Sequence, residues 1–225
     1  MMPTRQPTHN PLFRTLVVHT GGIGDFLLAL PTIRHLAKDG SVELLGRRER
    51  LDLAVAAGIA DKSYDLDQVA FHTVFSKPAP VLKTFLARFQ RAIVWMNDED
   101  HAIKQALSDC GIANVRVFPG LPPENWTDHA SRYYLQTLDA SAPPPARLVL
   151  PRSGDHLDIA IHPGSGGNAK NWPIEHFYDL TNRLLDQGRQ VHWILGPAEE
   201  DKHPPRTAKR IEQRPLVELG SLLAD

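Results

Sequence analysis

Short apolar runs alternate with amphipathic segments along the first sixty residues of the chain. The run Thr15–His19 is typical of a buried strand, and beyond a glycine-rich turn apolar residues recur at helical spacing from Phe26 to Leu36. Val42–Gly46 predicts a second strand, and Leu51–Gly58 predicts a second helix that ends in glycine. This order of elements favours a parallel sheet that carries helices on its faces.

The alternation continues less regularly to about residue 140. We expect three further helices and two further strands, namely helices over Val81–Arg91, Ile103–Cys110 and Thr127–Leu138 and strands over Ala92–Met96 and Val115–Phe118. Thr127 is placed to cap the last of these helices. Three consecutive prolines follow within Ser141–Ala146. Because prolines lack backbone donors and stiffen the chain, this segment predicts a domain boundary.

The strand-loop-helix pattern restarts after the prolines. Ile159–His162 and Val191–Leu195 predict strands, and the segment between them predicts a helix that begins near Pro173 and ends at Gly188. The last elements that we expect are a short basic helix over Ala208–Arg214, which Pro215 ends, and a third strand over Leu216–Leu219.

These elements predict an α/β protein of two Rossmann-like domains with parallel sheets. We expect a flexible tail over residues 1–13, a first domain over 14–140, a linker over 141–150 and a second domain over 151–225. The second domain offers about three strands, fewer than the five or six of an average sheet. We therefore expect its sheet to be incomplete, because the chain is a fragment, because the gene is truncated, or because a partner or an oligomer completes it.

Charge and composition exclude several classes of function. The 225 residues carry 25 Lys and Arg against 26 Asp and Glu, so the basic excess of a nucleic-acid-binding protein is missing. Apolar runs such as Phe26–Leu30 fall far short of the about 20 residues needed to cross a bilayer, and the polar N-terminus does not resemble a secretory signal. A single cysteine, Cys110, and eleven histidines without an H-E-x-x-H pattern argue against a zinc site. We expect a cytoplasmic protein, and a peripheral contact with the cytoplasmic face of the inner membrane stays open.

Two glycine-rich loops follow predicted strands, where α/β proteins bind their ligands. In the second loop, Gly164, Gly166 and Gly167 allow backbone amides to approach an anion closely, and Lys170 supplies a full positive charge. The helix that follows adds a partial positive charge of about half a unit at its N-terminus. These features suit a diphosphate. An ordinary glycine loop with a solvated lysine is the alternative.

Two common phosphate-binding motifs do not fit these loops. A Walker loop needs Ser or Thr after its lysine, whereas Asn171 follows Lys170. A dinucleotide fingerprint needs a third glycine, and Leu27 occupies that position after Gly22 and Gly24. A nicotinamide-dependent oxidoreductase is therefore less well supported, and it stays open as a third hypothesis.

The two loops together resemble a known enzyme family. The segments IHPGSGGNAKNWPIEHFYDL and VHWILGPAEED resemble the nucleotide-sugar domain of glycosyltransferase family 9, the ADP-heptose:lipopolysaccharide heptosyltransferase family. The N-terminal VVHTGGIGDFLLALPTIRHL resembles the opening motif of the same family. The resemblance spans roughly residues 14–225, with the two motifs about 140 residues apart. It implies a GT-B fold and an inverting, metal-independent transferase without a cofactor, which uses a nucleotide-sugar donor and a lipopolysaccharide-core or similar glycan acceptor.

The resemblance also implies roles for particular residues. Asp25 matches the proposed general base, which would take the proton of an acceptor hydroxyl. The residues implied on the donor side are Ser165, Gly166, Gly167, Lys170, Glu199 and Glu200. On the acceptor side we expect Gly22 and Gly24 of the first loop, and Arg47 and Arg48, which with Arg50 follow the second strand and suit phosphates or carboxylates.

Simpler structural roles stay open for the same residues. Asp25 is also suited to cap a helix, Glu199 and Glu200 to complement a helix dipole, and the arginines to form a solvated face. The family continues into an Asp-Ser/Thr-Gly segment followed by a histidine, and this chain ends at Asp225, before such a segment. The alternative function is therefore a truncated, inactive family member that binds nucleotides or partner proteins.

Overall fold

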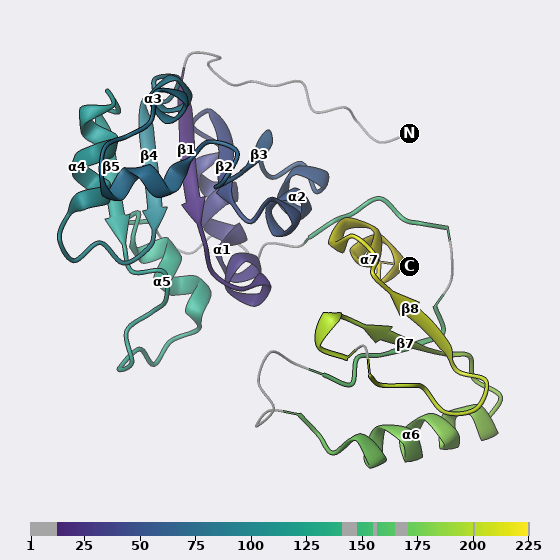
Figure 1. Ribbon diagram of the computed structural model, residues 1–225. Helices are drawn as coiled ribbons and strands as arrows, with labels where there is room; N and C mark the ends of the chain where they lie inside the picture. The colour runs from purple at the N-terminus through teal and green to yellow at the C-terminus, as the bar shows by residue number, and fades with distance from the viewer. Residues whose placement is uncertain (1–12, 141–147, 155–156, 165–170, 200, 225) are drawn as a thin grey trace. The chain divides into compact units, whose positions relative to one another are not determined.

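The computed structural model describes residues 13–140, 148–154, 157–164, 171–199 and 201–224. The chain divides into two compact units, Met1–Val149 and Leu150–Asp225, and each contains its own parallel sheet (Figure 1). The division falls at the end of the segment expected as a linker, residues 141–150. No described helix is long and apolar enough to cross a membrane.

A five-stranded parallel sheet forms the centre of the first unit. Its strands stand in the order β3-β2-β1-β4-β5, and they are β1 (Arg14–His19), β2 (Ser41–Gly46), β3 (Lys62–Asp65), β4 (Arg91–Trp95) and β5 (Asn114–Phe118). β1 lies in the middle, and Leu16, Val17 and Val18 are fully buried there. A parallel strand covered on both faces has a continuous apolar sequence, which explains why the sequence predicted β1, β2 and β4.

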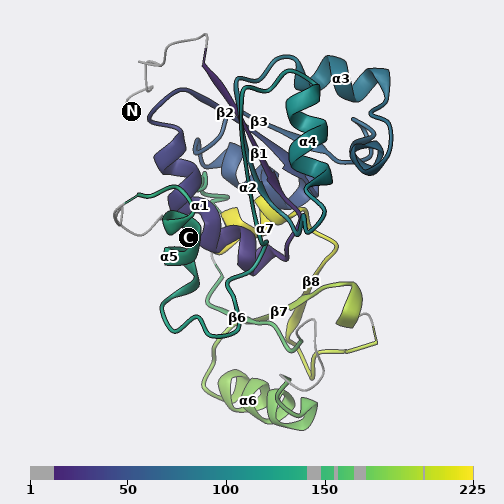
Figure 2. The same cartoon turned by 90° about the vertical axis from the view of Figure 1, so that its left-hand side faces the viewer.

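Helices cover both faces of this sheet (Figure 1) (Figure 2). One face carries α1 (Ile23–Leu36), α2 (Arg48–Ala56) and α5 (Ala130–Gln136), whose apolar side chains form one core cluster. The other face carries the 3-10 helix η1 (Phe71–Phe75), α3 (Pro80–Leu86) and α4 (Ala102–Asp109). In β1, Val17 belongs to the first cluster, and Leu16 and Val18 belong to the second.

Some elements of the first unit differ from the predicted ones. The helix expected to reach Arg91 ends at Leu86, because Arg91 is the first residue of β4 and pairs with β1. The helix expected from Thr127 starts at Ala130, where the His129 ring accepts a hydrogen bond from the Ser131 amide at 3.3 Å. The strand β3, with the sequence KSYD, escaped prediction because it has no apolar run; it forms by pairing with β2.

The second unit contains a three-stranded parallel sheet. Its strands, in spatial order, are β6 (Ile159–Ile161), β7 (Val191–Leu195) and β8 (Lys209–Glu212). The helix α6 (Ile174–Asp186) packs its apolar stripe on this sheet, and the fully buried Trp193 donates a hydrogen bond from Nε1 to Thr181 Oγ1 at 2.9 Å. Gly188, with φ of +75°, ends the helix as predicted.

The last two predicted elements of the chain were wrong in type. The segment expected as a basic helix contains β8, because residues from Lys209 to Glu212 pair in parallel with β7. The segment expected as a strand forms α7 (Leu216–Leu222). Pro215 lies at the N-cap of α7 with φ of −52°, so the proline starts a helix here instead of only ending one.

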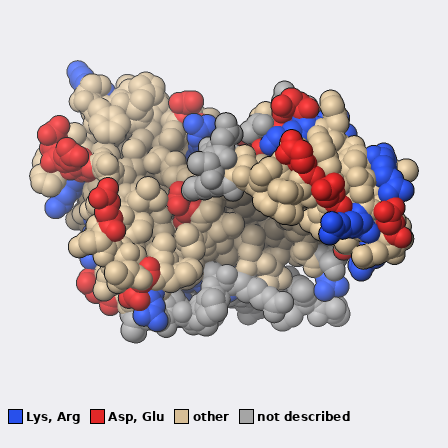
Figure 3. All heavy atoms as spheres, turned by 90° about the horizontal axis from the view of Figure 1, so that it is seen from below, with Lys and Arg blue, Asp and Glu red and all other residues tan. Residues whose placement is uncertain are grey.

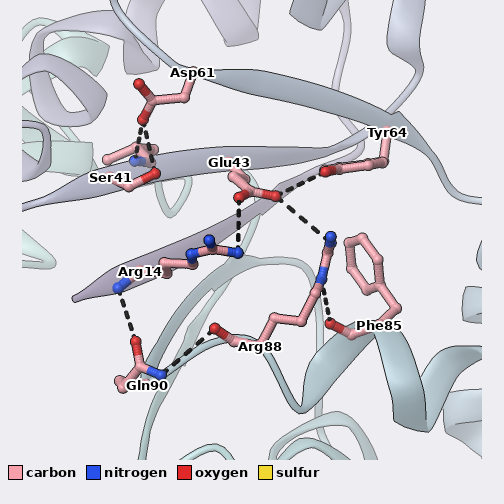
Figure 4. A network of polar contacts seen from close by, with 9 residues as sticks. Arg14, Ser41, Glu43, Asp61, Tyr64, Phe85, Arg88 and Gln90 are labelled. Carbon is pink, nitrogen blue, oxygen red and sulfur yellow. Dashed lines mark hydrogen bonds and ion pairs between the residues drawn. The ribbon is translucent and has the colours of Figure 1, made fainter. Parts of the chain in front are cut away.

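A buried polar network ties the first unit together near the amino ends of its strands (Figure 4). Glu43 on β2 is almost fully buried. Its carboxylate accepts a hydrogen bond from the Tyr64 hydroxyl at 2.9 Å and lies 3.5 Å from Arg88 and 3.9 Å from Arg14. A buried carboxylate is tolerated when it is paired and hydrogen-bonded in this way. The network lies toward the strand ends opposite to the glycine-rich turn, so it supports the fold and not the site.

Candidate active site

The first turn of α1 presents Asp25 beside the end of β1. Gly22 is the N-cap of the helix, with extended backbone, and its amide donates a hydrogen bond to Asp25 Oδ2 at 3.0 Å. Asp25 thus stands at the third helical position, where the helix dipole favours a carboxylate. It is partly buried, and no hydrogen bond among the described residues uses Oδ1. One oxygen is therefore fixed, and the other is available to a ligand.

The three glycine positions of the first loop differ in how much room they leave for a side chain. A Cβ atom on Gly21 would lie 2.9 Å from Cε1 of His19 and 3.2 Å from Cβ of Asp25, so this position has no room for a side chain. A Cβ atom on Gly22 would lie 3.2 Å from Asp25 Oδ2. A Cβ atom on Gly24 would meet no atom of the described residues within 4 Å. Gly21 is thus the glycine that the packing requires, and the predicted acceptor roles of Gly22 and Gly24 stay predictions.

His19, the last residue of β1, is a site residue that the sequence analysis did not single out. It is 3% exposed, and its ring lies between those of Phe26, Trp95 and Tyr134, at centroid distances of 5.5, 6.2 and 6.0 Å. Burial lowers the pKa of His19 from 6.5 to about 4, and the positive charge of Arg50 acts in the same direction, whereas Asp25 opposes it. His19 is therefore neutral at pH 7, and its Nε2 atom has no hydrogen-bond partner among the residues that the structure describes.

The arginines after β2 do not share one environment. Arg50 donates a hydrogen bond from its guanidinium to the carbonyl of Gly21 at 2.6 Å, so it reaches the glycine loop directly. Arg47 is exposed at the N-cap of α2, and Arg48 is exposed with its Nε 3.8 Å from Asp52. The contacts with an acceptor predicted for Arg47 and Arg48 stay predictions. Arg50 is the member of the group that the fold brings to the glycine loop before Asp25.

Two tyrosines of α5 fix the loop after β5 on the same side of the sheet. The hydroxyl of Tyr134 donates a hydrogen bond to the carbonyl of Gly120 at 2.9 Å, and that of Tyr133 to the carbonyl of Pro119 at 2.7 Å. Burial, followed by the negative charge of Asp25, raises the pKa of Tyr134 to about 12. Tyr134 is therefore a neutral donor near Asp25, and it adds no negative charge to the site.

Most of the predicted donor residues lie outside the described part of the chain. These residues are Ser165, Gly166, Gly167, Lys170 and Glu200. Both ends of their loop are described. Gly164 lies at one end, and at the other end Trp172 is half exposed and stacks on His176 with ring centroids 4.9 Å apart.

Glu199 joins the two loops that follow β6 and β7. It is 3% exposed at the end of the 3-10 helix η3 (Pro197–Glu199), and its Oε2 atom accepts a hydrogen bond from the Gly196 amide at 3.0 Å. Its Oε1 atom lies against Gly164, where an added Cβ would stand only 1.9 Å away. Glu199 therefore fills the space between Gly164, where the glycine-rich loop starts, and Gly196.

Two further contacts hold the loop after β6, one to β7 itself and one to the loop that follows β7. His162 Nδ1 lies 2.8 Å from the carbonyl oxygen of Ile194, and Lys202 Nζ donates to the carbonyl of Pro163 at 3.4 Å. The start of the glycine-rich loop is thus held by contacts from the neighbouring strand and its loop.

No group of three His, Cys, Asp or Glu among the described residues is arranged to hold a metal ion.

Comparison with known proteins identifies the class of fold. The sequence model of glycosyltransferase family 9 (heptosyltransferase) matches residues 130–219. The structure of a glycosyl transferase family 9 protein from Veillonella parvula aligns with a TM-score of 0.73 at 14% identity, over 97% of this chain and 75% of that chain. No curated protein matches the chain significantly.

Two heptosyltransferases from E. coli have similar structures. ADP-heptose lps heptosyltransferase II aligns with a TM-score of 0.65 at 16% identity, over 94% of this chain and 76% of that chain. Heptosyltransferase WaaC, solved with ADP-2-deoxy-2-fluoro heptose, aligns with a TM-score of 0.62 at 15% identity, over 94% of this chain and 80% of that chain. At these identities the likeness concerns the fold, and the predicted α/β fold of GT-B type with two parallel sheets is confirmed.

Proposed function

We propose that this chain, whose residues 130–219 match the sequence model of glycosyltransferase family 9, moves a heptose or a related sugar with inversion from a nucleoside diphosphate donor to a lipopolysaccharide-core or similar glycan acceptor. One observation carries the proposal. A partly buried carboxylate, Asp25, stands at the carboxyl end of a central parallel strand, where α/β proteins act on ligands. ADP-heptose is the donor to test first, because a relative of similar fold was solved with a fluorinated analogue of it.

Asp25 is the proposed general base. A sugar hydroxyl is a weak nucleophile until a base takes its proton during attack. In the proposed step the acceptor oxygen forms a bond to the anomeric carbon while the bond from that carbon to the diphosphate oxygen breaks, and Asp25 receives the hydroxyl proton. The Gly22 amide holds Oδ2, which leaves Oδ1 for the acceptor. A carboxylate fixed before substrate binds loses little entropy during the reaction.

The second unit is the proposed donor side. The departing diphosphate gains negative charge in the transition state, so preoriented amides and a cation stabilise it more strongly there than in the ground state. We assign these roles to the amides of Gly166 and Gly167 and to the side chain of Lys170, on the basis of the sequence motif. The buried Glu199 supports this assignment, because it contacts Gly164, at the start of the loop, and accepts a hydrogen bond from the Gly196 amide.

The acceptor side is proposed to combine charge with apolar surface. Arg50 reaches the glycine loop through the Gly21 carbonyl, and its guanidinium fork suits a phosphate or carboxylate of an anionic acceptor. Ile23 and Leu27 flank Asp25 on α1 and are exposed, although both are large and apolar. Such a pair suits the apolar face of a sugar ring or of a glycolipid.

Transfer by the purified chain tests this proposal. ADP-heptose and a heptose-free lipopolysaccharide core are incubated with the protein. The release of ADP is measured, and the mass of the acceptor is determined by mass spectrometry. We expect ADP release that depends on the acceptor, together with a product heavier by one heptose. Binding of ADP without turnover would contradict the transferase and favour the nucleotide-binding alternative. Thermal stabilisation by NAD and not by ADP would favour an oxidoreductase.

A further inference from the structure

The segment Phe71–Arg88, here called the η1–α3 surface, exposes large apolar side chains beside well-buried ones. Phe75 is 58% exposed and Val81 is 50% exposed, whereas Val74 and Leu82 next to them belong to the core. The connection between η1 and α3 is ordered by a hydrogen bond from the Ala79 amide to Thr73 Oγ1 at 3.0 Å. Phe75 and Val81 are therefore exposed on a segment that is itself folded, and their exposure does not result from local disorder.

The same surface carries positive charge and no carboxylate of its own. Residues 71–88 contain two lysines and one arginine and no Asp or Glu, in a chain whose net charge is −1. Arg88 is engaged by the buried Glu43, but Lys77 and Lys83 are exposed and form no ion pair with the described residues. On the face drawn in Figure 3, by contrast, acidic and basic side chains are interspersed.

A hollow of about 370 Å³ opens beside this surface, between η1, α3 and α4. Phe75 and Pro78 line it on one side, with Lys83 at the same opening, and Ala106 and Cys110 line it from α4. Its lining includes one carboxylate, Asp109, which also accepts a hydrogen bond from Gln105 at 2.8 Å. The hollow therefore combines apolar walls with a lysine, a combination that suits part of a lipid molecule.

We propose that the η1–α3 surface docks the protein on an anionic lipid bilayer. Phe75 and Val81 enter the boundary between headgroups and acyl chains, and Lys77 and Lys83 contact the lipid phosphates. This combination of exposed apolar side chains with unpaired lysines is what interfacial binding requires. The surface lies on the sheet face covered by α3 and α4, whereas Asp25 belongs to α1 on the other face. The inference therefore does not depend on the proposed sugar transfer.

Co-sedimentation of the full chain with lipid vesicles tests the proposal. Vesicles of phosphatidylcholine, with and without phosphatidylglycerol, are compared at low and high salt. We expect binding to the anionic vesicles that weakens with salt. Each lysine is expected to contribute about fivefold to the partition coefficient between anionic vesicles and water. The double replacement Lys77→Gln with Lys83→Gln is therefore expected to lower this coefficient more than tenfold. Phe75→Ser is expected to lower it about tenfold even at high salt.

Matched variants make the test specific. Leu121→Ser removes a side chain that is 56% exposed on the same unit, and Lys38→Gln removes an exposed lysine next to α1. Both are expected to bind vesicles like the unchanged protein. Circular dichroism of every variant checks that the fold is kept, so that a loss of binding is not a loss of structure. No binding to anionic vesicles, or equal binding by all variants, would overturn the proposal, as would a protein partner that masks Phe75 in solution.

Discussion

The backbone amide of Gly22 donates a hydrogen bond to Asp25 Oδ2 over 3.0 Å. The proposed base is thus also the side chain that closes the first turn of α1. From the sequence, capping and catalysis were competing roles for Asp25. In the structure Gly22 is the N-cap and Asp25 is the third residue of the helix. Asp25 accepts the hydrogen bond from the Gly22 amide with only one of its two carboxylate oxygens. The capping contact therefore orients the carboxylate without occupying all of it.

Gly21→Ala is expected to disturb the site through His19. The new Cβ would lie 2.9 Å from Cε1 of a ring that is packed among aromatic side chains, so the loop must move. We expect a loss of about 1–2 kcal/mol in the free energy of unfolding and a decrease of about tenfold or more in transfer. Gly24→Ala is the control. Its Cβ would meet no atom of the described part of the chain within 4 Å, and alanine is expected to stabilise α1 by about 0.5–1 kcal/mol. Urea unfolding and ADP release measure both effects; equal behaviour of the two variants would contradict the account.

Gly164→Ala is expected to weaken nucleotide binding through Glu199. The added Cβ would stand 1.9 Å from Oε1 of a buried carboxylate, so either the loop or the carboxylate must shift. We expect the Kd for ADP to rise about tenfold, which corresponds to about 1.4 kcal/mol. Glu199→Ala is expected to have a similar effect, because it leaves the Gly196 amide without its acceptor, whereas Glu199→Gln keeps an oxygen there and is expected to be milder. Calorimetry measures the Kd; an unchanged value in Gly164→Ala would show that this packing does not support the donor loop.

The stability of the first unit is expected to fall in mild acid because of His19. The pKa of His19 is about 4 in the folded protein and 6.5 ordinarily, so between these values the unfolded chain binds the proton first. The contribution of His19 is therefore complete above pH 6.5 and is lost as pH decreases toward 4, with about 2 kcal/mol lost between pH 7 and pH 5. In His19→Gln this part of the pH dependence is expected to be missing. Urea unfolding at both pH values measures it, and identical pH dependence in the two proteins would rule out the assignment.

Transfer is expected to proceed without a divalent metal ion. In the proposed reaction the leaving diphosphate is stabilised by backbone amides and Lys170, and these groups need no metal to act. We expect the rate of ADP release to change less than about twofold when EDTA replaces Mg²⁺, a difference of only about 0.4 kcal/mol in the barrier. Abolition of transfer by EDTA, restored by added Mg²⁺, would require a different account of the donor side.

The sequence predicted the buried strands well and the polar ones poorly. Strands such as β1 are covered on both faces, so nearly all their residues are apolar and the strand is visible as a continuous apolar run in the sequence. β8 has the sequence KRIE and is exposed at three of its four positions, so its strand structure comes from pairing with β7 and not from its own pattern. The same tertiary pairing explains β3. The misassigned α7 followed from interpreting Pro215 as a helix end when it is the N-cap.

Sequence motifs marked some residues of the candidate site, and they did not mark those that only the fold brings together. Asp25 follows directly from the glycine-rich motif. His19 looked like the polar end of a strand, and its partners Trp95 and Tyr134 come from β4 and α5, which no local pattern reveals. The signal that could have marked His19 as a candidate site residue is its position, as a histidine at the end of an otherwise apolar strand. Arg50 differs from Arg47 and Arg48 only in the direction that α2 gives it.

The most direct test of the central claim is the rate of heptose transfer by Asp25→Asn. Asparagine keeps a side-chain oxygen that can accept the Gly22 amide, so the first turn of α1 is expected to survive, whereas the amide cannot take a proton. We predict a decrease in kcat of about 10²–10⁴-fold, with little change in the Kd for ADP. Asp100→Asn, at an exposed aspartate in the loop after β4, is expected to transfer at the unchanged rate. Transfer by Asp25→Asn at the rate of the unchanged protein would contradict the account.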